Sequence, residues 1–102
     1  LDSTGDVLAP IGNIKIQTAG KGLYVKEGTN AKAGSATLAA GSVVVSTTAV
    51  TASSRIQLTS NADGGTPGFV RVSARTAGTS FTITSSSGTD TSTIAWLIVE
   101  PA

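Results

Sequence analysis

Apolar and polar residues alternate along short runs of this chain, and glycine-containing turns separate one run from the next. Residues 55–59 show the pattern well, because Ile56 and Leu58 fall on one side and the polar residues between them on the other. A period of two is typical of a half-buried β-strand, whereas a helix needs an apolar stripe that repeats every 3.6 residues. No segment of the sequence carries such a stripe, so the chain is predicted to be all-β.

The alternating runs and their turns predict about eight strands, over residues 13–17, 22–26, 35–38, 42–46, 55–59, 69–75, 80–84 and 93–100. Strands of this length and spacing favour an antiparallel β-sandwich that resembles a jelly roll. Residues 1–13 are expected to form an N-terminal arm or linker. Residues 14–102 are expected to form the β-sandwich domain.

The inward positions of the predicted strands supply a core between two sheets. The residues expected in this core, or in an interface between subunits, are Ile56, Leu58, Val70, Val72, Phe81, Ile83, Trp96 and Ile98. Three arginines stand at outward positions, where they could add to a surface patch that contacts a partner: Arg55, Arg71 and Arg75.

The last predicted strand is apolar on both faces. Ile94, Trp96 and Ile98 point one way, and Ala95, Leu97 and Val99 point the other. A strand that is apolar on both faces needs burial on both faces. Two explanations remain open: a central strand covered by loops of the same chain, or a strand whose second face lies in a subunit interface.

Several kinds of site are excluded by what the sequence lacks. Without His or Cys there is no Ser-His-Asp or Cys-His nucleophile, no zinc or iron–sulfur site on those ligands and no disulfide. A net charge of +1 with scattered basic residues gives no stripe for nucleic acid. The longest apolar run, residues 94–99, is far shorter than the ~20 residues that span a bilayer. We expect no cofactor, no nucleic-acid partner and no membrane insertion.

Two aspartates stand in predicted loops, Asp63 in a glycine-rich one and Asp90 in one rich in Ser and Thr. Loop carboxylates can hold calcium, but no EF-hand or nonapeptide repeat is present, so we interpret both as solvated turn residues. With four Asp and two Glu, a paired-carboxylate site would require distant loops to converge. The chain is therefore expected not to be an enzyme.

Several blocks of the sequence together resemble a C-terminal module of tailed-bacteriophage virion proteins. They are GLYVKEGTNAK at 22–32, ATLAAG at 36–41, VTASSRIQLT at 50–59, GTSFTITS at 78–85 and DTSTIAWLIVEP at 90–101. The resemblance runs from about Ile14 to the C-terminus and leaves residues 1–13 outside it.

The resemblance implies a β-sandwich module, usually trimeric, at the end of a tail fibre or tailspike or in a head decoration protein. It carries no catalytic or cofactor-binding residues. The expected function is therefore a non-enzymatic structural protein of the virion, a homotrimeric knob that binds other virion proteins of the fibre shaft or capsid. The alternative is a module at a tail-fibre tip that binds a receptor or glycan of the host surface, since its exposed faces and loops are rich in hydroxyls.

Overall fold

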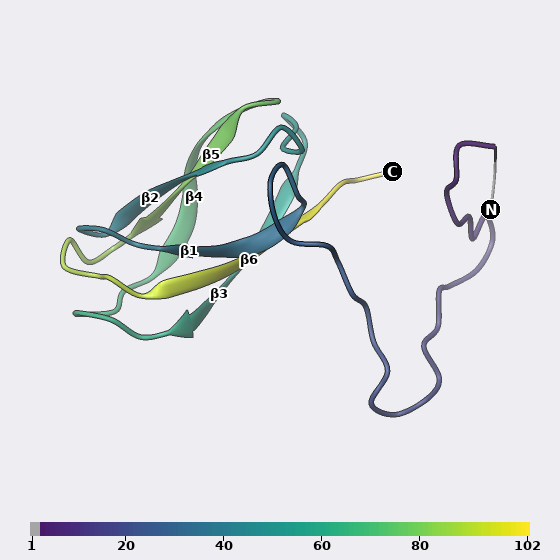
Figure 1. Cartoon of the computed structure of the whole chain (residues 1–102), viewed down its shortest axis with the longest axis horizontal. Coiled ribbons are helices and arrows are strands. Elements are labelled where there is room, and N and C mark those ends of the chain that lie inside the picture. The colour runs from purple at the N-terminus through teal and green to yellow at the C-terminus, as the bar shows by residue number, and fades with distance from the viewer. Residues whose placement is uncertain (1–2) are drawn as a thin grey trace.

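The computed structural model describes residues 3–102, so Leu1 and Asp2, the first residues of the expected arm, lie outside the described part. The described chain contains six strands (Figure 1). They are β1 (Ala33–Thr37), β2 (Ser42–Ser46), β3 (Arg55–Ala62), β4 (Val70–Thr76), β5 (Ser80–Ser85) and β6 (Thr93–Val99). Among residues 3–102 no helix is long and apolar enough to cross a membrane.

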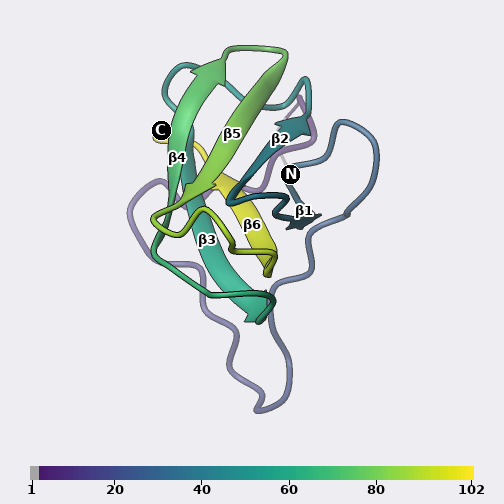
Figure 2. The same cartoon turned by 90° about the vertical axis from the view of Figure 1, so that its left-hand side faces the viewer.

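The strands form two antiparallel sheets, with the orders β1-β6-β3 and β2-β5-β4. Figure 2 shows them as two layers, with β4, β5 and β2 nearer the top of the view than β3, β6 and β1. Strands β5 and β6 occupy the middle of their sheets, so each has neighbours on both sides. We call residues 33–99 the two-sheet body.

The core of the two-sheet body lies between the central strands. Every second residue of β5 and β6 is buried, as the alternation predicts. Phe81 from β5 meets Trp96 from β6 edge to face, with ring centroids 5.3 Å apart and an interplanar angle of 78°. This geometry is favourable for an aromatic pair and joins the two sheets at their centre. The other buried core residues are Leu38, Val45, Val50, Ile83, Ile94 and Ile98.

The prediction of an all-β fold with antiparallel pairing is confirmed, but the prediction of eight strands is wrong. Residues 13–17 and 22–26 form no strands, although the six later predicted strands occur in the predicted order. Ile14, Ile16 and Leu23 are exposed. These runs have strand-like sequences but no neighbouring strand among residues 3–102. The jelly-roll description, which requires eight strands, does not apply to six.

The two faces of β6 are buried to different extents. Ile94, Trp96 and Ile98 are buried against the other sheet, whereas Ala95 and Leu97 are half-buried and Val99 is 47% exposed. The strand is central in its sheet, yet the rest of the chain covers its outer face only in part. An apolar strip therefore runs down the middle of the outer face of the β1-β6-β3 sheet.

Candidate functional site

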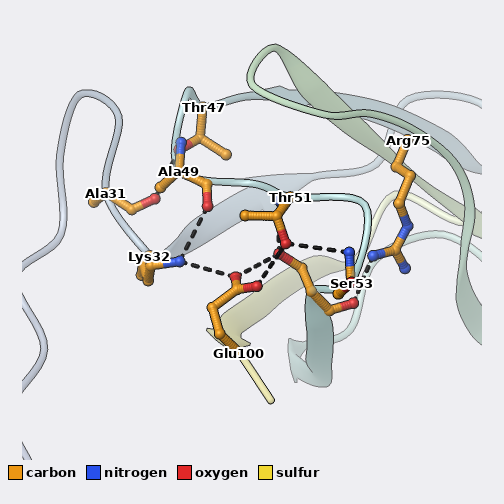
Figure 3. Close-up of polar contacts among 9 residues, drawn as sticks. Ala31, Lys32, Thr47, Ala49, Thr51, Ser53, Arg75 and Glu100 are labelled. Atoms are coloured by element: carbon orange, nitrogen blue, oxygen red, sulfur yellow. Dashed lines mark hydrogen bonds and ion pairs between the residues drawn. The ribbon is translucent and has the colours of Figure 1, made fainter. Parts of the chain in front are cut away.

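One polar cluster lies where the chain enters and leaves the two-sheet body (Figure 3). Glu100 directly follows β6, and its carboxylate accepts hydrogen bonds from Thr51 Oγ1 at 2.6 Å and Ser54 Oγ at 2.5 Å. Lys32 Nζ, just before β1, lies 2.9 Å from Glu100 Oε2 and also donates to the Ala49 carbonyl oxygen at 3.1 Å. We call Lys32, Thr51, Ser54 and Glu100 the Glu100 cluster.

The Glu100 cluster joins segments that are far apart in the sequence. The Lys32–Glu100 pair connects the start of β1 to the end of β6, and the two hydroxyls belong to the loop between β2 and β3. Arg75 Nη1 from β4 adds a hydrogen bond to the Ser54 carbonyl oxygen. One carboxylate thus holds parts of both sheets together at this end of the body.

The electrostatics of the Glu100 cluster favour an ionised carboxylate. Hydrogen bonds from Ser54, Thr51 and Lys32 lower the pKa of Glu100 to about 2. Desolvation acts in the opposite direction and is outweighed. The side chains of Lys32 and Glu100 are 41% and 29% exposed, so the ion pair itself is screened by solvent and adds little stability.

A second cluster surrounds Asp90 in the loop between β5 and β6. Asp90 Oδ2 accepts hydrogen bonds from Ser85 Oγ at 2.6 Å and from the Gly68 amide at 2.9 Å. Asp90 Oδ1 accepts one from the Ser92 amide at 2.9 Å. The expectation of a solvated turn aspartate is wrong for Asp90, which is 1% exposed, and holds for the exposed Asp63. Gly68, Ser85, Asp90 and Ser92 are the Asp90 cluster.

Hydrogen bonds from the Ser85 and Ser92 side chains, the Ser92 amide and the Gly68 amide hold the pKa of Asp90 well below its usual range. Its carboxylate ties the loop before β4 to the loop before β6. In both clusters the carboxylate oxygens already accept protein hydrogen bonds, so both act as structural ties. Among residues 3–102, no group of three His, Cys, Asp or Glu side chains could hold a metal ion, and no pocket is found.

These pKa shifts predict that the free energy of unfolding falls as the pH is lowered from about 5 towards 2. Glu100 and Asp90 have ordinary values of 4.5 and 3.8 in the unfolded chain but stay ionised to lower pH in the folded one. The unfolded chain therefore binds more protons in this interval, and acid favours it. Urea unfolding followed by Trp96 fluorescence at a series of pH values measures the slope.

Glu100→Gln should flatten this pH dependence, because the titrating group is gone while the amide oxygen can still accept a hydrogen bond. The same substitution at the exposed Glu27 is the matched control. A Glu100→Gln variant with the wild-type slope would show that Glu100 does not link folding to pH.

The structure places the eight predicted core and interface residues around one core. Four of them are buried: Phe81, Ile83, Trp96 and Ile98. The other four are half-buried and pack against that core: Ile56, Leu58, Val70 and Val72. All eight point inward in their strands, whereas the polar clusters lie at the ends of the body.

The three predicted contact arginines do not come together. Arg55 is in β3 of one sheet, where it pairs with Val99. Arg71 and Arg75 are in β4 of the other sheet, and Arg75 turns to the Ser54 carbonyl. The outer face of the β2-β5-β4 sheet carries hydroxyls beside Arg71, and Ser73 and Thr84 share a 2.6 Å hydrogen bond there.

Glu100 and Lys32 were not identified from the sequence, and Asp90 was interpreted only as a solvated turn residue. Glu100 and Lys32 are 68 positions apart, and nothing local marks them as partners. The hydrogen bonding of Asp90 could have been predicted from the sequence. Asp90 stands between Ser85 and Ser92, and Asp, Ser and Thr side chains in loops often hydrogen-bond to nearby backbone groups.

Two antiparallel sheets that share one core and are tied at their ends by hydrogen-bonded carboxylates define a small all-β structural module. Residues 30–99 match the model of the family "K1 capsule-specific polysaccharide lyase, C-terminal domain", and the chain belongs to that family. The family is a phage tailspike domain, which confirms the coarser part of the resemblance, a phage tail-associated C-terminal module. No significant match was found among curated proteins or solved structures.

The family match covers less of the chain than the resemblance did, because it starts at residue 30 rather than at Ile14. It therefore coincides with the two-sheet body and leaves out the preceding segment. The family is the C-terminal part of a lyase, so the match suggests no enzymatic role for this domain.

Proposed function

We propose that this chain is a non-enzymatic structural module of a phage virion, a homotrimeric knob at the end of a tail fibre or tailspike. The observation that carries the proposal is the family match over residues 30–99, which covers all six strands. Attachment to the tail is favoured over a place on the capsid surface, because the family is a tailspike domain.

The outer face of β6 supports the oligomeric part of the proposal. Leu97 and Val99 lie on the central strand of a sheet and remain partly exposed, and apolar residues at such positions are often covered by another subunit. The remaining partners in this proposal are other virion proteins, those of the fibre shaft.

A second candidate function, a receptor- or glycan-binding module at the fibre tip, is favoured by the outer face of the β2-β5-β4 sheet. Its outward positions include Ser42, Ser46, Thr82 and Thr84, which can donate and accept hydrogen bonds with a sugar. The two functions are compatible, since the end of a fibre can be both a structural cap and the part that meets the host.

Native mass by light scattering after size exclusion tests the structural proposal. We expect about 30 kDa, three times the chain mass of 10.0 kDa, because the resemblance to phage fibre-end modules implies a trimer. A mass of one chain at high concentration, together with no association with purified fibre shafts, would contradict the proposal. Binding of the same sample to a panel of bacterial surface glycans would establish the second function, and its absence at high concentration would exclude it.

A further inference from the structure

We propose that residues 7–25 are the oligomerisation element of this protein, in which the alternating runs of one chain form β-structure with the same residues of other copies. This inference deepens the proposed function and rests on its oligomeric state. We call residues 3–30 the leading segment. Its last residues contact the two-sheet body, where Glu27 forms an isolated bridge with Ala33 and the Thr48 amide donates a hydrogen bond to Asn30 Oδ1. The earlier part runs away from the body in Figure 1, and the segment forms no strand.

The leading segment exposes most of the large apolar side chains that the described chain leaves in contact with solvent. Eight of the eleven are in it: Val7, Leu8, Ile11, Ile14, Ile16, Leu23, Tyr24 and Val25. Flexible linkers are typically polar and poor in β-branched and aromatic residues. A concentration of exposed apolar residues marks an interaction surface. The segment therefore has the composition of a β-strand whose apolar side chains are not buried by the rest of the described chain.

A turn in the leading segment separates its two strand-like runs. The Lys21 amide donates a hydrogen bond to the Thr18 carbonyl oxygen at 3.1 Å, and Gly20 has a φ of 80°. Ala19 is not among the residues with positive φ, so this is a type II turn, which requires a positive φ only at its third residue.

The type II turn explains why the runs on either side of it do not pair with each other. Hairpins favour type I′ and II′ turns, because the twist of types I and II splays the flanking strands. The run around Ile14 and Ile16 and the run around Leu23 and Val25 are therefore directed apart. Neither run has a partner strand among residues 3–102, so burying its apolar side chains would require a strand from elsewhere to pair with its backbone groups.

Beyond the apolar strip along the outer face of β6, in which only Val99 is exposed, the surface of the two-sheet body does not match this apolar segment. Its exposed large apolar residues are only Val44 in β2, Phe69 before β4 and Val99 at the end of β6. Val44 and Val99 lie on strands of different sheets, and Phe69 lies in the loop before β4. The leading segment of another copy, in contrast, carries the same eight apolar side chains with the same alternation, so the complementary surface is a second copy of the segment.

Cysteine substitution provides a direct test, because the natural chain contains no cysteine. We expect Ile16→Cys and Leu23→Cys to form disulfide-linked dimers readily under mild oxidation, seen on a non-reducing gel. Val44→Cys, an exposed apolar position on the two-sheet body, is the matched control and should cross-link at least tenfold more slowly.

A second variant measures the same contact by mass. Ile14→Ser with Ile16→Ser should reduce the oligomer to single chains, while Trp96 fluorescence shows the body still folded. Val44→Ser should leave the mass unchanged. If the Ile14/Ile16 variant keeps the oligomer mass and neither Ile16→Cys nor Leu23→Cys cross-links, this inference is wrong. The proposed function, a trimeric knob, is unaffected by that result. A wild-type chain that is a single copy overturns both.

Discussion

Replacing Trp96 by alanine is expected to lower the free energy of unfolding by about 3–5 kcal/mol. Trp96 is 7% exposed at the centre of β6, between Gly34 of β1 and Leu58 of β3, and it meets Phe81 edge to face. Its Nε1–H has no hydrogen-bond partner in the described chain, so packing alone holds the indole. Alanine would remove that packing and leave a cavity between the sheets.

Urea unfolding followed by circular dichroism measures the loss, since the variant has no tryptophan to report by fluorescence. Phe69→Ala is the matched control, because Phe69 is 87% exposed and its removal should cost no more than about 0.5 kcal/mol. A Trp96→Ala variant as stable as Phe69→Ala would place Trp96 outside the core.

The six strands of the body could be predicted from the sequence because each pairs with a neighbour in the same chain. The runs around Ile14 and Leu23 alternate just as clearly and form no strand. Alternation reports which face of a strand would be buried, but it does not report whether a partner strand exists within the chain. The two strands that were predicted but are not formed, residues 13–17 and 22–26, are therefore the same runs for which we propose pairing with another copy.

The polar clusters could not be predicted for a different reason. The role of Glu100 depends on Lys32, Thr51 and Ser54, which only the fold brings together. The three arginines show the opposite case, since residues with the same outward pattern in the sequence are kept apart by the fold. Arg55 and Arg71 both stand at outward positions of their strands. Because β3 and β4 belong to different sheets, the two side chains lie on opposite sides of the two-sheet body.

Gly34→Val is expected to destabilise the protein by about 1–3 kcal/mol, the usual cost of overpacking a core. Gly34 pairs with Trp96 across β1 and β6, so both point into the core. A Cβ atom added at Gly34 would lie 2.8 Å from Cζ2 and 3.0 Å from Cε2 of the indole. The ring cannot move aside easily because Phe81 packs against it. Glycine is required here by the close approach of the tryptophan, not by the backbone conformation.

A double-mutant cycle identifies the cause of this loss. If the valine clashes with the indole, Gly34→Val should cost much less in a Trp96→Leu background, and the coupling between the two sites should exceed about 0.5 kcal/mol. Ser35→Val is the matched control, because the neighbouring side chain points to the exposed outer face of the same strand. An equal cost of Gly34→Val in both backgrounds would mean that the strand rejects valine for a reason unrelated to Trp96. A reduced cost would show that β1 carries glycine so that β6 can place its tryptophan against Phe81, one of the core contacts that join the two sheets.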